Sequence, residues 1–266
     1  MPGNSYELFG GPCHWDLVLH FYVVLGLKLA TAEGCVDGDG NIREPRLNAV
    51  SRRFVTRLER SFHRTWNPGW NPATKKGTWK LYDFAPCCSF HIDATFEVAP
   101  ASLRGQNMSK EEVRRRLPEH YGVIVIEDIE GNVNPHADLH GKIVVMSPDD
   151  IDDSTFAHEL GHIMGLPDQH KHAHVHVPPD EERRHRGHLM GTAVNGRRQI
   201  AQHEIDEIAA HAGMTCDRET CCPREQRTAE NKKTRRAGRD APVRTPCTRD
   251  PLPGGVLGTW DYVLAR

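Results

Sequence analysis

The segment 156–168 constrains the fold more than any other stretch of the chain. His158 and His162 stand four residues apart, so on an α-helix both imidazoles lie on one face and can bind the same metal ion. The helix must end soon afterwards, because Gly165 can adopt the left-handed conformation that ends helices and Pro167 cannot continue one. The segment therefore predicts a helix with two metal ligands, followed at once by a turn.

Glu159 gives this predicted metal site a chemistry. Zinc accepts nitrogen and oxygen ligands in tetrahedral array, and a catalytic zinc keeps one position open for water. Metal binding makes that water acidic, and a carboxylate within hydrogen-bonding reach can take its proton. The pattern His158-Glu159-x-x-His162 therefore predicts a zinc site with Glu159 as general base. So short a pattern also occurs by chance, and its weight depends on the residues beyond His162.

Two later features agree with the pattern. Asp168 places a carboxylate just beyond the helix break, and Met190 is bracketed by glycines in the segment 187–191. Together they resemble the metzincin metallopeptidases, whose pattern H-E-x-x-H-x-x-G-x-x-H is followed by a Met-turn under the metal. Residues 187–191 match this Met-turn. The resemblance implies zinc ligands, a general base and two structural residues: His158, His162 and Asp168; Glu159; Gly165 and Met190.

The chain departs from the metzincin pattern at two positions. The third ligand position holds Asp168 instead of histidine, which is similar to the small bacterial branch typified by snapalysin. Thr192 stands two places after Met190, so a tyrosine that swings onto the metal is not expected.

Other interpretations of these residues stay open. The two histidines and the glutamate could be the polar face of an exposed helix, and Met190 could simply fill the core. Asp168 could belong only to the turn after the helix, with Glu204 of a later helix or a nearby histidine as third ligand. The nearby histidines stand at every second position: His170, His172, His174 and His176. In an extended segment all four would face one side. They could form a second metal site, a polar wall toward the substrate or a solvated loop.

Periodicity along the chain predicts an α+β fold. Strands are expected at 15–25, 77–84, 88–98, 122–126 and 142–146, and helices at 47–66, 109–120 and 198–212. The resemblance to metzincins implies a mixed twisted sheet with a long backing helix, the active-site helix, the Met-turn and a C-terminal helix. It also implies that an extended peptide substrate pairs with an edge strand beside the metal. The loop 131–141 is a candidate border of that cleft.

We expect one catalytic domain over residues 1–222, with subdomains 1–165 and 166–222. Residues 223–266 are expected to form a basic, proline-containing tail with an aromatic end that can contact a partner. A net charge of −2 over 266 residues gives no electrostatic ground for a nucleic-acid or membrane partner. No signal peptide or membrane span is visible, so we expect a cytoplasmic protein or one exported by a non-classical route.

The eight cysteines fit either disulfides or reduced thiols. The sequence thus predicts a zinc-dependent endopeptidase that acts on a protein or peptide substrate. The alternative is a non-catalytic, histidine-rich metal-binding protein.

Overall fold

The computed structural model describes eleven stretches of the chain. They are residues 6–11, 13–67, 79–80, 88–103, 110–127, 135–138, 142–152, 154–169, 178–194, 198–216 and 218–221. The chain divides into two units, Met1–Cys222 and Pro223–Arg266. All described residues belong to the first unit, and the predicted tail lies outside them.

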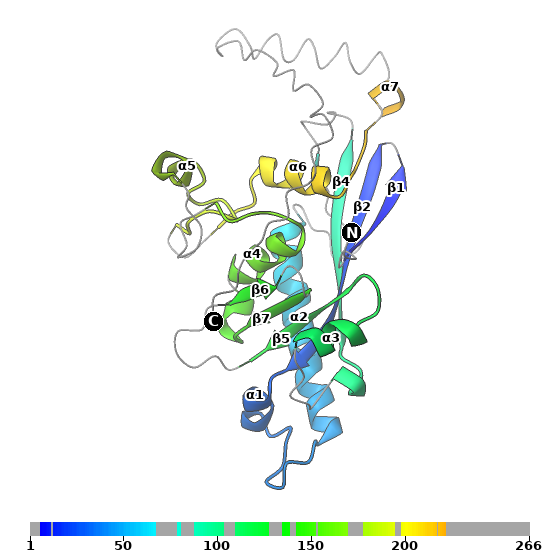
Figure 1. Ribbon diagram of the computed structural model, residues 1–266, viewed down its shortest axis with the longest axis vertical. Helices are drawn as coiled ribbons and strands as arrows, with labels where there is room; N and C mark the ends of the chain where they lie inside the picture. The colour runs from blue at the N-terminus through cyan, green and yellow to red at the C-terminus, as the bar shows by residue number, and fades with distance from the viewer. Residues whose placement is uncertain are drawn as a thin grey trace. The chain divides into compact units, whose positions relative to one another are not determined.

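The first unit is built on one mixed sheet of seven described strands (Figure 1). They are β1 (Tyr6–Gly11), β2 (His14–Leu25), β3 (Trp79–Lys80), β4 (Ser89–Val98), β5 (Tyr121–Ile126), β6 (His136–Asp138) and β7 (Ile143–Met146). Their order is β3-β4-β2-β5-β7-β6, with β1 paired to β2. The four strands β4, β2, β5 and β7 are parallel neighbours, whereas β1, β3 and β6 pair antiparallel.

The described part of the chain combines this sheet with seven helices. This composition confirms the predicted α+β fold class. The helices are α1 (Leu27–Ala32), α2 (Glu44–Trp66), α3 (Lys110–Arg116), α4 (Ser154–Ile163), α5 (Pro179–Arg184), α6 (Gln202–His211) and α7 (Arg218–Cys221), with short 3₁₀ turns η1 (Ala101–Leu103) and η2 (Asp149–Ile151). No helix in the described part of the chain has the length and apolar character that crossing a membrane requires.

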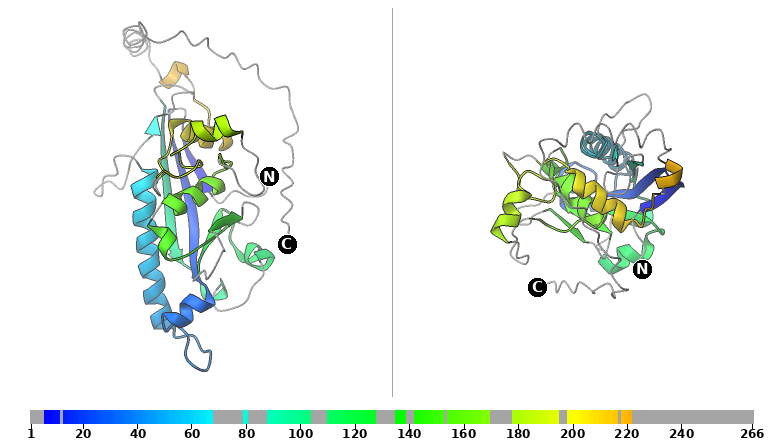
Figure 2. Two further views of the ribbon diagram at one scale, coloured as in Figure 1. Left: turned by 90° about the vertical axis from the view of Figure 1, so that its left-hand side faces the viewer. Right: turned by 90° about the horizontal axis from the view of Figure 1, so that it is seen from above.

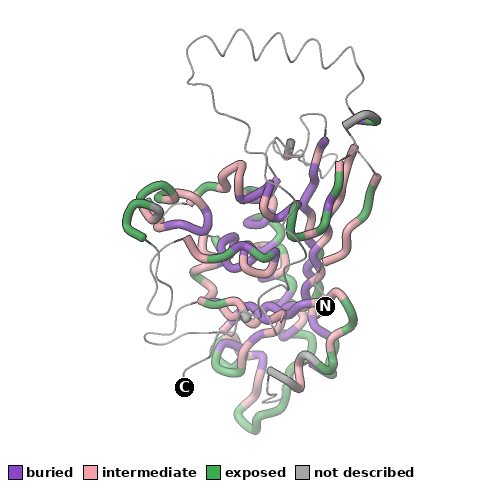
Figure 3. Tube along the Cα trace, turned by 45° about the horizontal axis from the view of Figure 1, so that its top comes forward, coloured by how far each residue is buried: buried purple, intermediate pink, exposed green. Residues whose placement is uncertain are grey.

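Strand β2 lies at the centre of the sheet, between β4 and β5, and its alternate side chains are deeply buried. Every second residue from Leu17 to Leu25 is buried, and the pleat turns all of these residues to one face. On the opposite face Tyr22 and Tyr121 stack with ring centroids 4.7 Å apart. Figure 3 shows the buried residues gathered along the central strands and the helices that pack on them.

Helices α2 and α4 pack on the same face of the sheet. Phe96 of β4 contacts Phe62 of α2 and Phe156 of α4, with ring centroids 6.0 Å apart in both pairs. The buried side of the long helix α2 recurs every three or four residues: Leu47, Val50, Phe54, Leu58, Phe62 and Trp66. Arg57 of α2 also pairs with Asp152 just before α4. The long helix is therefore tied to the segment that leads into α4, and the left view of Figure 2 shows α4 beside it.

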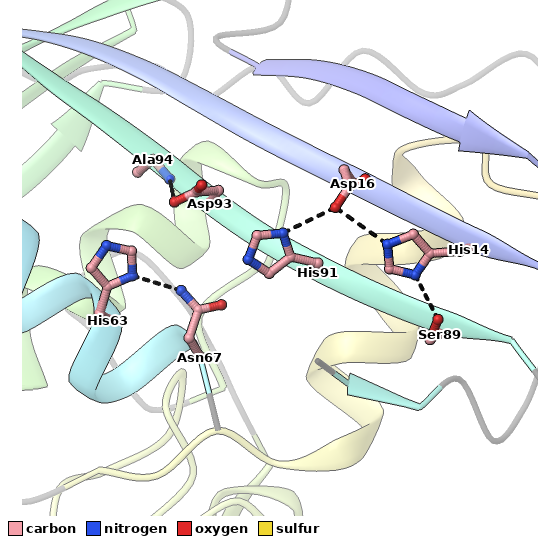
Figure 4. Close-up of polar contacts among 8 residues, drawn as sticks. All are labelled: His14, Asp16, His63, Asn67, Ser89, His91, Asp93 and Ala94. Carbon is pink, nitrogen blue, oxygen red and sulfur yellow. Dashed lines mark hydrogen bonds and ion pairs between the residues drawn. The ribbon is translucent and has the colours of Figure 1, made fainter. Parts of the chain in front are cut away.

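A polar network joins the ends of β2 and β4 (Figure 4). Asp16 accepts from the buried His91 at 3.0 Å and lies 3.4 Å from His14. His14 also bonds Ser89 at 2.6 Å. The parallel register places Asp16 opposite His91 and His14 opposite Ser89, so these contacts lock the register of the two strands.

Disulfides fix the segment after α6 to the beginnings of two strands. Cys13, just before β2, is bonded to Cys221, and Cys88, just before β4, to Cys216. Cys35 is a buried free thiol. For the four bonded cysteines the structure decides between the two redox interpretations in favour of disulfides.

Three predicted element bounds were wrong. Helix α3 ends at Arg116 instead of near His120, because Pro118 disfavours helical conformation in the residue before it. Helix α6 begins at Gln202 instead of Arg198, because Gln199 forms a bridge with His188 that keeps the chain extended. The predicted loop 131–141 contains strand β6. Of the predicted strand 77–84, only β3 lies within the described residues.

Candidate metal centre

Helix α4 brings the two predicted histidine ligands together on one face. The rings of His158 and His162 meet edge to face, with centroids 4.8 Å apart. His158 is almost completely buried, and His162 is only slightly more exposed. The i, i+4 spacing of the sequence thus becomes a pair of adjacent imidazoles inside the protein.

Backbone carbonyls hold both rings from behind. Nδ1 of His158 lies 2.8 Å from the carbonyl oxygen of Leu189, and Nδ1 of His162 lies 2.9 Å from that of Leu166. A carbonyl oxygen only accepts hydrogen bonds, so each Nδ1 carries the proton. In a neutral ring the lone pair then lies on Nε2, and this is how proteins orient metal-binding histidines.

Asp168 completes a three-ligand group. Its Oδ1 atom lies 3.3 Å from Nε2 of His158 and 3.4 Å from Nε2 of His162. The candidate ligand atoms of the three residues all lie within 4.8 Å of one another. Ligand atoms bound at about 2.0–2.2 Å around a tetrahedral zinc ion would be about 3.3–3.6 Å apart. The donor types and the measured separations therefore fit zinc.

The charges of the group respond to this arrangement. Burial would raise the pKa of the Asp168 carboxyl, but the close approach of His158 and His162 outweighs burial and holds that pKa well below its usual range. Burial would lower the pKa of His162, yet the nearby Asp168 carboxylate raises it. Burial dominates at His158 and lowers its pKa. The site therefore keeps one fixed negative charge against two imidazoles.

Glu159 lies beside the ligands and beside the edge strand. Its side chain is buried, and burial raises its pKa to about 7. The backbone of Ala137 in β6 lies close enough to lower this pKa in part. Strand β6 pairs with β7 along its other edge, so the edge of β6 that faces Glu159 borders the candidate metal centre.

Gly165 ends the ligand helix as predicted. Its φ of +94° is in the left-handed region. The N–H of Gly165 bonds the carbonyl of His162, and the N–H of Leu166 bonds that of Gly161, which is the Schellman arrangement. This turn aims the chain back toward α4, so that Leu166 can hold His162 and Asp168 can reach both histidines.

The segment 187–191, which resembles a Met-turn, packs directly beneath helix α4. Met190 is fully buried, and its sulfur lies 2.6 Å from the point that a Cβ atom would occupy at Gly161. Gln169 donates its N–H to the carbonyl of Met190 at 2.9 Å. Met190 therefore supports the helix between the two histidine ligands.

Glu204 does not join this metal centre, so the interpretation of Glu204 as third ligand was wrong. It is fully buried, and its carboxylate accepts the N–H groups of Met190 at 2.8 Å, Leu189 at 3.4 Å and Ala201 at 2.7 Å. A carboxylate with two oxygens can accept several donors at once. Glu204 thus fixes the Met-turn to the beginning of α6.

The structure also holds residues that sequence reasoning missed. The Leu189 and Leu166 carbonyls have no sequence signal, and the three-residue strand β6 is too short to show periodicity. His185, His188 and His203 form a second group of adjacent imidazoles, although no short pattern joins them in the sequence. The alternating histidines lie outside the described residues: His170, His172, His174 and His176.

Comparison with models of known protein families finds no match, and neither does comparison with curated proteins. Among solved structures, one titled "Structure of a chaperone-substrate complex" is similar at a TM-score of 0.31 with 13% identity. The alignment covers 74% of this chain and 36% of that chain, a likeness too low to support any conclusion. What the chain does is therefore inferred from its own side chains.

Proposed function

We propose that the protein is a zinc-dependent endopeptidase. The observation that carries the proposal is the convergence of His158, His162 and Asp168, with each histidine held from behind by a backbone carbonyl. If these residues were only the polar face of a helix, they would be expected to face solvent. Instead, His158 and His162 are buried around Asp168. A ligand group prepared in this way is typical of a metal site.

Glu159 is the residue that we expect to move protons. Zinc, when bound by the three ligands, polarises the scissile carbonyl and makes a water molecule acidic. Glu159 accepts the proton of that water and then returns it to the leaving amine, so one carboxylate acts as base and acid in turn. Its place on α4 directly after His158 keeps it beside the group of candidate ligands.

Strand β6 supports a peptide as the substrate. Ala137 of β6 lies beside Glu159, and β6 is an edge strand among the described residues. An extended peptide can add to such an edge through backbone hydrogen bonds, which do not depend on its sequence. A peptide bound there would cross the candidate metal centre.

The arrangement of elements adds support to the resemblance with metzincins. The mixed sheet with β6 at one edge, and the helices α2 and α4 on one face, agree with the expectation for that family. Met190 beneath α4 has the position expected for its Met-turn.

The alternative function is metal binding without catalysis. The second group of histidines favours it, because a protein that only stores metal needs ligands and no general base. Hydrolysis separates the two functions, since only the peptidase cleaves peptides and only its cleavage depends on Glu159.

The deciding experiment compares wild-type protein with Glu159→Gln in a peptide-library cleavage assay, with the zinc content measured on the same samples. We expect Glu159→Gln to lower the cleavage rate at least about 100-fold and to retain its zinc. Glu119→Gln is the matched control, because the Glu119 side chain is 80% exposed. This variant should cleave peptides at the wild-type rate. Undiminished cleavage by Glu159→Gln would overturn the assignment of Glu159 as general base. Full zinc content in His162→Ala would overturn the assignment of His162 as a ligand.

A further inference from the structure

Three histidines that the proposed active site does not use lie close together beside the Met-turn. His185 follows α5, His188 belongs to the Met-turn and His203 lies on α6. Their ring centroids are 5.2–5.5 Å apart. One candidate ligand nitrogen from each ring lies within 4.8 Å of the others.

Two of these rings have unused polar atoms inside the protein. Nδ1 of His185 and Nδ1 of His188 are buried and form no hydrogen bond with any described residue. Buried polar atoms normally have a partner, and one that lacks it indicates an ion or water in the native protein. A metal ion is a partner that several imidazole nitrogens can share.

The acidic residue next to His203 in sequence is occupied elsewhere. Glu204 binds the backbone of the Met-turn, so the group consists of the three imidazoles.

The backbone holds this group in place before any ion binds. The N–H of His188 bonds the carbonyl of His185 at 3.0 Å, and the N–H of Gly191 bonds that of His188 at 3.2 Å. At Gly191 a Cβ atom would collide with the His185 carbonyl, so only glycine allows the turn to close this tightly. His188 also lines a surface hollow with Gly187, Val194 and Ile200.

We propose that His185, His188 and His203 form a second, structural site for a divalent transition metal ion, with zinc as the best fit. Imidazole ligands suit zinc, copper and nickel, whereas magnesium and calcium prefer oxygen ligands. Gln169 adds an oxygen donor at the same place. Its amide nitrogen lies 3.5 Å from Nε2 of His203, its Oε1 is buried without a hydrogen-bond partner, and the two ends of an amide can exchange by rotation.

The position of the site suggests its purpose. An ion held by these three residues would cross-link α6 to the Met-turn. The neighbour of His188 in the Met-turn is Leu189, whose carbonyl orients His158. The second ion would therefore stabilise the part of the chain that orients a ligand of the first, and its presence does not depend on whether the protein is a peptidase.

The test is a zinc measurement on the full chain after dialysis against a weak chelator. Wild-type protein is compared with His203→Ala, His185→Ala and the control His120→Asn, which removes an imidazole elsewhere. Asparagine tolerates the left-handed conformation at position 120, where φ is +64°. We expect both cluster variants to hold one zinc fewer per chain than wild type, and the control to lose none.

Two further measurements separate this site from the rest of the chain. The variant His162→Ala should also lose one zinc, and the combination His162→Ala with His203→Ala should lose two. The histidines at 170–176 are unchanged in every variant, so their contribution cancels. Circular dichroism checks that each variant is folded, and His188→Asn replaces any variant that is not. Equal zinc content in the wild type and the folded cluster variants would overturn the proposal.

Discussion

The sulfur of Met190 lies 2.6 Å from the position that a Cβ atom would take at Gly161. Real Cβ atoms do not approach a neighbour so closely, and Gly161 therefore lets the Met-turn reach the helix between His158 and His162. Met190 and Gly161 therefore pack closely at the part of α4 that carries His158 and His162.

Gly161→Ala should for this reason destabilise the protein, although alanine is favoured over glycine by about 1 kcal/mol in a helix interior. Overpacking costs about 1–3 kcal/mol, so we expect the free energy of unfolding to fall by about 1 kcal/mol in urea titrations. In a Met190→Ala background the same change should be neutral or stabilising, because the sulfur is gone. An equal loss in both backgrounds would show that the contact is unimportant. Gly38→Ala, where a Cβ meets nothing within 4 Å, is the control.

Removing the Glu204 carboxylate should loosen the Met-turn without removing a metal ligand. Glu204→Ala leaves three backbone N–H groups without their acceptor, and each buried donor left unpaired costs about 1–3 kcal/mol. We expect a loss of at least about 3 kcal/mol in the free energy of unfolding. Glu204→Gln keeps one acceptor oxygen and should lose less.

Zinc content distinguishes this structural role of Glu204 from the role of a ligand. Glu204→Gln should retain the zinc of the wild type. If it lost zinc while its unfolding curve stayed unchanged, Glu204 would have to be counted among the ligands after all.

Gly165→Ala should disturb the helix end in two ways. Alanine is strained at a φ of +94°, and its Cβ would lie 2.7 Å from Nδ1 of His211. Gly40→Ala isolates the first effect, since Gly40 has a φ of +84° with open space around it. We expect Gly40→Ala to cost about 1 kcal/mol and Gly165→Ala to cost more, as measured by thermal unfolding. Equal losses would mean that His211 moves aside freely.

Reduction of the disulfides should lower the thermal stability of the described unit. Cys13–Cys221 and Cys88–Cys216 close loops across sequence separations of 208 and 128 residues. Removing a native disulfide typically costs about 2–5 kcal/mol, and each kcal/mol shifts Tm by about 2–4 °C in a domain of this size. We expect Tm to fall by about 10 °C or more in a reductant, with thiol titration to confirm reduction. An unchanged Tm in fully reduced protein would contradict this prediction.

Local patterns predicted much of the fold because they depend on few residues. The i, i+4 histidines, the Gly165 stop and the alternation in β2 and β4 each follow from the period of a helix or strand. These patterns placed α2, α4 and the central strands correctly and brought His158 and His162 onto one helix face. Asp168 and Met190 were selected by family resemblance, and in the structure both lie against α4.

Tertiary structure decided everything that joins distant segments. The sequence could not show whether Glu204 is a metal ligand or a structural residue. Its partners are backbone amides of a turn fourteen and fifteen residues earlier, and a sequence pattern does not show such contacts. Strand β6 has only three residues, and its pairing with β7, not its composition, makes it a strand. The disulfide partners and the group of His185, His188 and His203 are likewise products of packing. The sequence by itself determined which side chains share one helix, and the fold decided which carbonyls, amides and histidines meet them.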